Sequence, residues 1–388
     1  MKLLHTADWH VGRLIRGRSR AEEHRAVLAD IARIADDEAV DLVIVAGDLF
    51  DSATPSPESE RIVYRALLEL AATGAKVLVL AGNHDSDRRL QAVEPLLELG
   101  HVITRPVFTK PDDGGVVEVR SREGEETALV ACLPFLSQRW VVKADELVAG
   151  GLGDAHTQYA ERVRNLLGAL TARFGDGETV NIVAAHCMVH GATTVGSERA
   201  AHSIFEYSVH ATSFPPSAHY VALGHLHRPQ QVAGPGLIRY CGSPLMLDFG
   251  EVNDTKTVSV VEVHAGAPAQ VREVALQGAR RLVVAEGDLA ALRAQVDSGA
   301  LDGAWVKVRV HEHMRVGLAD EVRQLVPDAV DVEVVRAGDD DAGARRPAYD
   351  RAGRAPHELF AAYLVAEGVD DPRLGTLFAQ LIEEVSSA

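Results

Sequence analysis

Polar side chains follow five short apolar segments of the sequence, each at the point where the segment ends. Taken singly these motifs are weak, because Asp-x-His and His-x-His pairs arise by chance in many chains. Gly82-Asn83-His84-Asp85 is more specific, since four defined residues follow an apolar run. Open α/β sheets place functional groups at the carboxyl ends of their strands. The residues expected to share one site are Asp8, His10, Asp48, Asn83, His186, His225 and His227.

The types of these residues indicate a metal site. Carboxylate, imidazole and amide ligands without a thiolate suit Mn²⁺, Fe²⁺ or Zn²⁺. One shared carboxylate can bridge two cations roughly 3.5–4 Å apart, the spacing used in phosphoryl chemistry, and Asp48 is the natural bridge. Two such ions can hold a phosphodiester's oxygens and lower the pKa of a bound water. The glycines before Asp48, Asn83 and His225 are expected to allow the turns that aim these side chains.

Two further residues of the third motif are candidates for catalysis. His84 stands beside Asn83 and is expected to stabilise the transition state or to protonate the leaving oxygen. Asp85 is expected to orient His84, as a carboxylate behind a catalytic imidazole does. Trp9 is expected to pack under the metal loop. His5, inside the first apolar run, is read as a core residue, and His186 is preferred over His190 as a ligand.

The segments that must position these groups alternate between strand and helix patterns. Strand-length apolar runs cover 2–7, 41–46, 76–81, 181–185 and 219–223. The second and third runs are apolar without alternation, as in strands buried on both faces. Helical spacing is found over 21–39, 58–70 and 89–99. This order predicts an α/β core. The β-rich texture of 238–263 predicts a second sheet packed against the first.

The C-terminal third is expected to divide into smaller parts. A break near 265–280 ends the first domain, assigned to 1–270, and 280–336 reads as a small β-α-β-α-β domain. Residues 337–355 have linker composition. Residues 356–388 carry two helical patterns, and the second has one continuous apolar stripe. The tail therefore either folds back onto its own domain or docks onto a partner helix.

Composition and charge exclude several classes of protein. A chain of 388 residues, 47% of them hydrophobic, can bury a large core. No apolar run is long enough to span a bilayer, and polar residues interrupt any leader peptide, so a cytoplasmic location is expected. The cysteines (Cys132, Cys187 and Cys241) are read as buried hydrophobes, since they form no CxxC pair.

The net charge of −17 argues against nucleic-acid binding through a global positive field. A polyanionic substrate would need metal ions, a partner or a local basic patch. Arginines at 13, 16, 18, 20 and 25 form such a run. They are either a phosphate-binding patch or a solvated loop that enters a helix.

The five motifs together resemble the calcineurin-like metallophosphoesterases. More closely, the chain resembles the SbcD family, the nuclease subunits of bacterial SbcCD double-strand-break repair complexes. The segments that carry the resemblance, which covers nearly the whole chain, are His5-Thr6-Ala7-Asp8-Trp9-His10-Val11-Gly12, Gly47-Asp48-Leu49-Phe50-Asp51, Ala81-Gly82-Asn83-His84-Asp85, Ala222-Leu223-Gly224-His225-Leu226-His227 and Arg239-Tyr240-Cys241-Gly242-Ser243-Pro244.

This resemblance implies an α/β fold: a two-sheet metallophosphoesterase sandwich flanked by helices, a small α+β capping domain and C-terminal helices. It implies one metal held by Asp8, His10, Asp48 and His227, another held by Asp48, Asn83, His186 and His225, and His84 as a catalytic residue. Some relatives have histidine where this chain has Asp51, so no role is assigned to Asp51.

The resemblance also implies an activity and an assembly. The two metals are expected to be Mn²⁺ and the substrate DNA, cut as an exonuclease on duplex ends and as an endonuclease on single strands or hairpins. The partner is the SbcC ATPase, bound through the tail; ATP dependence would come from it, because this chain has no Gly-x-x-x-x-Gly-Lys-Ser/Thr loop. The helices at 58–70 and 89–99 either belong to the core or form a homodimer contact through Ile62, Leu67, Leu90, Val93 and Leu97; the resemblance favours the homodimer. The alternatives are a small-molecule phosphodiesterase of the same fold and a non-catalytic scaffold.

Overall fold

The structure is a computed structural model that describes residues 1–137, 159–175, 177–195 and 208–335, with single positions at 360, 363–364, 373–375 and 377–378. By their contacts, Met1–Val310 with Val316–Glu333 form one compact unit, and His311–Arg315 with Val334–Ala388 form another. Most of the tail and all of the expected linker lie outside the described residues, and the positions described in the tail from Phe360 to Phe378 are helical. The expected division into four segments stays a prediction.

The first sheet has the strand order β14-β13-β1-β2-β3-β4. Its parallel part is formed by β1 (Lys2–Thr6), β2 (Leu42–Val45), β3 (Lys76–Leu80) and β4 (Val102–Arg105). On its other side β1 pairs antiparallel with β13 (Thr257–Glu262), which in turn pairs with β14 (Gln270–Ala275). The three predicted strands of this sheet are present within one residue at each end.

The second sheet has the order β11-β12-β10-β7-β6-β5. Its central strands, β7 (Val180–His186) and β10 (Tyr220–Gly224), are parallel. The others are β5 (Val116–Arg120), β6 (Thr127–Leu133), β11 (Gln230–Val232) and β12 (Ile238–Tyr240).

One sequence prediction about the second sheet is wrong in part. The β-rich stretch 238–263 does not form that sheet by itself. Only β12 lies in it, whereas β13 extends the first sheet by pairing with β1. A strand's side-chain pattern shows that its faces are buried but not which backbone edge it joins.

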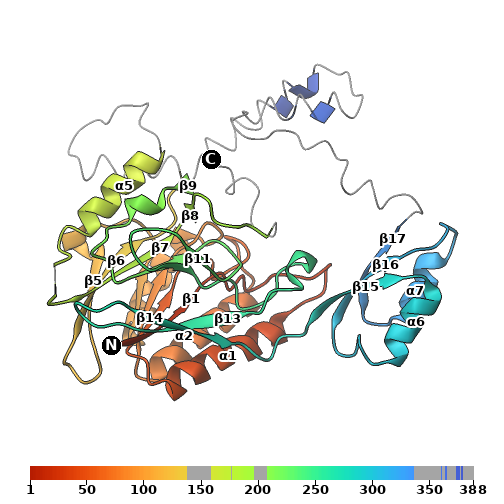
Figure 1. Ribbon diagram of the computed structural model, residues 1–388, viewed down its shortest axis with the longest axis horizontal. Helices are drawn as coiled ribbons and strands as arrows, with labels where there is room; N and C mark the ends of the chain where they lie inside the picture. The colour runs from red at the N-terminus through yellow and green to blue at the C-terminus, as the bar shows by residue number, and fades with distance from the viewer. Residues whose placement is uncertain are drawn as a thin grey trace. The chain divides into compact units, whose positions relative to one another are not determined.

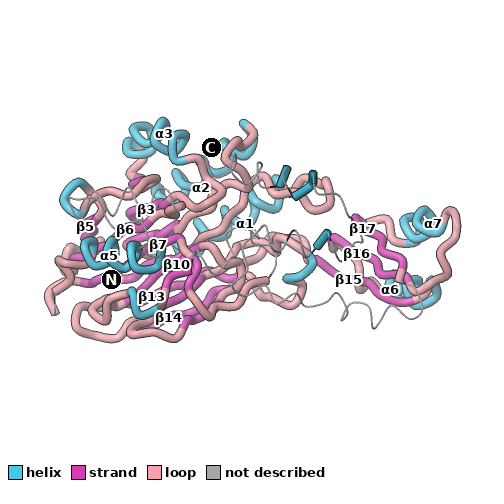
Figure 2. Tube along the Cα trace, turned by 90° about the horizontal axis from the view of Figure 1, so that it is seen from above, coloured by secondary structure: helices cyan, strands magenta, loops and turns pink. Residues whose placement is uncertain are grey.

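Alternate residues of the central strands point to two different apolar layers. Leu42 and Ile44 lie between the sheets, together with residues such as Ile182 and Ala222 of the second sheet. Val43 of β2 faces the opposite way, toward α1 (Ala21–Asp37), α2 (Pro57–Ala72) and α3 (Asp87–Leu99). The outer face of the second sheet is covered by α5 (Tyr159–Leu170). The result is a helix–sheet–sheet–helix sandwich (Figures 1 and 2).

The three predicted helices begin and end close to the expected residues. Ser56 and Ser86 accept backbone N–H groups at the starts of α2 and α3, which satisfies donors that have no partner inside a helix. Within the described residues no helix is both long and apolar enough to cross a bilayer. All three cysteines are buried and free, as expected.

A small three-stranded sheet follows the two large ones in the chain. Its strands are β15 (Leu282–Gly287), β16 (Trp305–Val310) and β17 (Ala329–Val334), in that order, with α6 (Leu289–Asp297) and α7 (Leu318–Leu325) between them. The element order is the predicted β-α-β-α-β. Leu282 of this sheet joins an apolar cluster with Ile15 and Phe249 of the preceding part of the chain.

His5 is a core residue, as expected. It is 0% exposed, and its Nδ1 lies 2.9 Å from the hydroxyl of Tyr220 in the second sheet. Burial lowers the pKa of His5 to about 3. The folded state therefore holds His5 neutral at pH values where the unfolded chain protonates it.

This burial predicts a pH dependence of stability. Because the folded pKa is depressed, the His5 contribution is complete above pH 6.5 and is lost as the pH falls toward 3. His5→Gln should reduce the slope of the unfolding free energy by about 1.4 kcal/mol per pH unit between pH 6 and 4. Urea unfolding of chelator-treated protein measures this slope. His313→Gln, at an exposed position, is the control, and equal slopes for both variants and the wild type would refute the assignment.

Candidate metal centre

Three of the expected ligands meet at the end of β1 and after β10. Single ligand atoms of Asp8, His10 and His227 lie within 4.8 Å of one another, and all three residues are buried. The Nε2 atoms of His10 and His227 are 3.1 Å apart. Two ring nitrogens so close cannot both carry a proton, so at least one presents a lone pair. This is the arrangement that a cation between them would use.

The other expected ligands converge on Asn83. Its Oδ1 lies 3.0 Å from Nε2 of His186 and 2.9 Å from Nδ1 of His225. Asp48 stands between the two groups, because its Oδ2 is 3.5 Å from Nε2 of His10 and 3.6 Å from Nε2 of His186. All seven predicted side chains therefore come together, and Asp48 has the position expected of a bridge. Their oxygen and nitrogen donors fit two divalent cations.

Backbone groups orient several of these side chains. Nδ1 of His186 donates to the carbonyl of Ala46 at 2.7 Å, which leaves Nε2 to face the site. The N–H of His225 donates to the carboxylate of Asp8 at 2.9 Å, and the N–H of His84 donates to Oδ1 of Asp48 at 2.8 Å. Such contacts behind a metal site fix tautomers and ring directions.

The electrostatics keep the bridging carboxylate charged. Burial alone would raise the pKa of Asp48, but His186, His10 and His84 together with the N–H of His84 hold the pKa below its ordinary value. Burial lowers the pKa of His186 against the opposing charge of Asp48. An ionised carboxylate and a neutral imidazole are the protonation states that bind a metal ion.

The backbone at the site is strained, and its glycines have two different roles. Asp8, His10, Asp48 and His225 all have positive φ, at 54°, 46°, 54° and 104°, a conformation that costs energy for side chains with a Cβ. Gly47 also has positive φ, as its predicted role in a turn requires. Gly82 and Gly224 do not. A Cβ at Gly82 would collide with Oδ1 of Asp48, and one at Gly224 with the carbonyl of Ala46.

His84 lies beside the expected ligands, with its ring centroid 4.6 Å from that of His10. Its Nδ1 is 2.8 Å from the carbonyl oxygen of Asp51. Nδ1 therefore carries the proton, which makes Nε2 the candidate atom for proton transfer at a substrate. Oδ1 of Asp51 is 3.6 Å from Nδ1 of His10, so Asp51 is placed to support His10.

The expectation that Asp85 orients His84 does not match this geometry. The Asp85 carboxylate accepts the backbone N–H groups of Leu49, Phe50 and Gly82 at 3.2, 3.1 and 2.9 Å, and the carbonyl of Asp51 holds the ring of His84 instead. Burial and the charge of Asp48 raise the pKa of Asp85. Asp85 thus ties the second motif to the third and is not a partner of the catalytic candidate.

Several residues near the site were not predicted. Phe135 stacks on His225 with centroids 6.3 Å apart and an interplanar angle of 15°. Glu251 and Lys256, both buried, form an ion pair of 2.6 Å behind His227. None of these residues belongs to a short motif, and a lone Glu or Lys in the sequence reads as a surface residue.

The arginine run after the first motif is largely paired with acidic residues. Arg13, Arg16 and Arg20 form ion pairs with Asp51, Asp331 and Glu23 at 3.3, 2.8 and 2.7 Å, and Arg25 pairs with Glu58 at 2.6 Å. These contacts favour a structural role for the run over a phosphate-binding patch.

Comparison with known proteins places the chain among phosphoesterases. Residues 1–229 match the family model for calcineurin-like phosphoesterases. The SbcD component of the SbcCD nuclease of Bacillus subtilis is 32% identical over 349 residues, which is 86% of this chain and 86% of that protein. The proteins of the same name from Rhodobacter capsulatus and Escherichia coli K12 are 36% and 31% identical; they cover 69% and 76% of this chain and 67% and 74% of their own lengths.

The crowding at Gly82 yields a prediction. Gly82→Ala places a methyl group against Oδ1 of Asp48, so the carboxylate must move. We expect the affinity for Mn²⁺ to fall by about tenfold or more, measured by calorimetric titration of chelator-treated protein. Gly168→Ala is the control, because a Cβ there meets no atom within 4 Å. Unchanged Mn²⁺ affinity in Gly82→Ala would contradict the predicted position of Asp48 in the metal site.

Proposed function

Since the chain belongs to the calcineurin-like phosphoesterase family and groups within it with the SbcD nucleases, we propose that it is a Mn²⁺-dependent DNA nuclease. The observation that carries this proposal is the gathering of seven candidate ligand side chains, six of them buried, with the carboxylate of Asp48 at their centre. The names of the relatives support DNA as the substrate.

In the proposed reaction some residues of the chain bind the metal ions and another transfers a proton. Two bound divalent ions would bind the phosphodiester oxygens and supply an activated water. Asp8, His10, Asp48 and His227 would hold one ion, and Asp48, Asn83, His186 and His225 the other. His84, whose Nδ1 donates to the carbonyl of Asp51, would act in its imidazolium form, in which the second proton on Nε2 is transferred to the leaving oxygen or donated in a hydrogen bond to the phosphate. Burial of the ligands keeps water from competing for them.

The proposal also accounts for the acidic composition. With a net charge of −17, the surface field as a whole repels DNA, and positive charge must be supplied where the phosphate binds. Metal ions supply it in concentrated form. Binding to a long duplex would then draw on the SbcC partner and the small domain. The nuclease would act in the cytoplasm, where bacterial DNA is found.

Two substitutions separate metal binding from catalysis. Asp48→Asn should abolish both Mn²⁺ binding and DNA cleavage, because it removes the shared charge. His84→Gln should retain both Mn²⁺ ions and lower cleavage by about 10²–10⁴-fold. Cleavage is measured on linear duplex DNA and on single-stranded DNA in the presence of Mn²⁺. The affinity of each variant for Mn²⁺ is measured by calorimetric titration.

His190→Gln is the matched control for His84→Gln, because His190 is exposed beyond the end of β7. The His190→Gln protein should cut DNA at the wild-type rate. The proposal fails if wild-type protein loaded with Mn²⁺, with and without SbcC, leaves DNA intact but hydrolyses a cyclic nucleotide. That result would identify a small-molecule phosphodiesterase. Absence of bound metal at every concentration would favour a scaffold.

We also propose that the chain forms a homodimer and that each copy binds SbcC through residues 356–388. Four of the five residues expected at the dimer contact (Ile62, Leu67, Leu90 and Leu97) are buried in the core, so they cannot form it. Three other leucines on α2 and α3 are exposed: Leu68 by 45%, Leu96 by 68% and Leu99 by 81%. Gly100, at the end of α3, abuts Leu68 of α2, so the two helices present one apolar surface. Adjacent exposed leucines of this kind are typical of a protein contact.

The two proposed contacts can be tested in one co-purification experiment with SbcC. Leu96→Glu with Leu99→Glu should give a monomer by light scattering that still binds SbcC, because charge is placed in the proposed dimer contact. Ending the chain at residue 337 should give a dimer that no longer binds SbcC. Leu14→Glu, at another exposed leucine (53%), is the control and should change neither. A dimeric double variant would refute the α2–α3 contact.

A further inference from the structure

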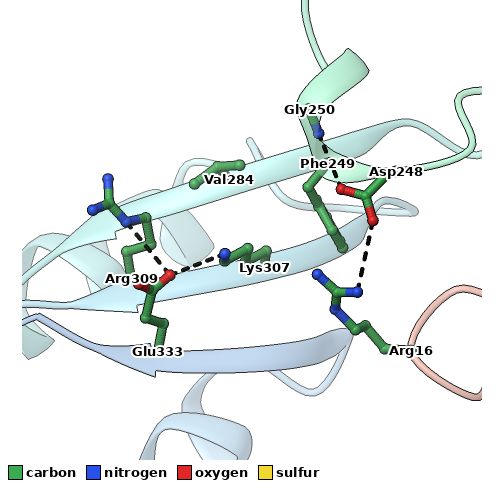
Figure 3. A pocket seen from close by; sticks show the side chains of 8 residues that line it. All are labelled: Arg16, Asp248, Phe249, Gly250, Val284, Lys307, Arg309 and Glu333. Carbon is green, nitrogen blue, oxygen red and sulfur yellow. Dashed lines mark hydrogen bonds and ion pairs between the residues drawn. The ribbon is translucent and has the colours of Figure 1, made fainter. Parts of the chain in front are cut away.

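A short 3-10 turn, Phe249–Glu251, lies between the small sheet and a metal-ligand candidate. On its outer side Phe249 packs with Leu282 and Val284 of β15. Figure 3 shows the Phe249 ring directed from the turn toward the strands that carry Val284 and Lys307, with Asp248 reaching toward Arg16. The Asp248–Arg16 ion pair measures 3.6 Å. One side of the turn thus contacts the small sheet.

The inner side of the same turn contacts His227. Glu251 is 0% exposed. Its Oε1 lies 3.8 Å from Nδ1 of His227, and its Oε2 accepts Nζ of Lys256 at 2.6 Å. Lys256 also donates to the backbone carbonyl of His227 at 3.0 Å. One buried ion pair therefore lies next to both parts of His227: Glu251 is near the ring and Lys256 binds the backbone carbonyl.

The two sides are joined by a short, hydrogen-bonded piece of backbone. The N–H of Glu251 donates to the carbonyl of Asp248 at 3.0 Å, and the side chain of Asp248 accepts the N–H of Gly250 at 3.3 Å. Only Gly250 separates Phe249 from Glu251 along the chain. We therefore expect a displacement of Phe249 by the small sheet to reach Glu251 through these hydrogen bonds.

A buried ion pair is a poor choice for packing alone, because apolar residues of similar volume stabilise a core as well or better. A metal-binding histidine has one ring nitrogen on the metal and a second that points away from it. A carboxylate next to this second nitrogen sets the tautomer and the direction of the ring. Nε2 of His227 faces His10, so Nδ1 is that nitrogen here.

We propose that Glu251 is a positioning residue for His227 and that the Asp248–Glu251 turn couples packing of the small sheet to the metal held with Asp8, His10 and Asp48. This inference rests on the metal site proposed above but not on DNA as the substrate. Loss of contact at Phe249 then weakens the binding of one metal, although Phe249 touches no ligand.

The test is a calorimetric Mn²⁺ titration of the full chain after chelator treatment, without substrate. Glu251→Gln combined with Lys256→Met removes both buried charges and leaves neither unpaired. It should weaken one of two Mn²⁺ sites by about 10–100-fold and leave the other unchanged. Glu251→Asp, which shortens the reach to His227 but keeps the charge, should weaken the same site. Glu251→Asp takes the place of the double variant in this test if the double variant does not fold.

Phe249→Ala tests the coupling and should weaken the same site by about 2–30-fold. Phe174→Ala is its control, a phenylalanine truncation in the apolar cluster under the second sheet, and should leave both sites unchanged. If folded Glu251 variants bind both ions as tightly as wild type, the positioning role is refuted. If only Phe249→Ala behaves as wild type, the coupling is refuted. A wild type that binds no Mn²⁺ refutes the metal site and this inference together.

Discussion

The structure depends on keeping two carboxyl groups, those of Asp8 and Asp48, inside the protein at 0% and 1% exposure. Buried charge is costly unless it is paired and hydrogen-bonded. Here the backbone N–H groups of His225 and His84 reach the carboxylates from other strand ends, and imidazoles surround them. Each motif therefore supports its neighbour's ligand as well as supplying its own, and the cations would complete the neutralisation. The positive φ angles of four of the candidate ligands show that the backbone is strained to make this arrangement.

The sequence predicted the central parallel strands and the convergence of the seven candidate ligand side chains because both depend on local rules. Unbroken apolar runs indicate strands such as β2 and β3, and polar residues directly after them must lie at the carboxyl edge of the sheet. The helix ends followed from apolar spacing to within two residues, and a capping side chain such as Ser56 fixes where α2 begins.

Features that depend on contacts between distant segments could not be predicted in this way. The placement of β13 in the first sheet is a choice of backbone partner that side-chain pattern does not encode. Asp85 looked like a partner of His84 because the two are adjacent, but its carboxylate is used by N–H groups that approach from Leu49 and Phe50. Glu251 and Lys256 are ordinary charged residues in the sequence, and only the fold buries them against His227.

The pairing of β1 with β13 has a consequence for the nascent chain. Residues 2–6 form a strand whose antiparallel neighbour lies at 257–262, so during synthesis β1 keeps one backbone edge open until β13, about 250 residues later in the chain, has left the ribosome. An open edge of apolar strand is the surface through which chains aggregate. The same delay applies to the ligands, since His225 and His227 emerge long after Asp8 and His10. The pairing of β13 with β1 and the completion of the set of candidate ligands are thus late and nearly simultaneous events of synthesis. A product truncated before His225 would lack both the paired edge and the last two histidines.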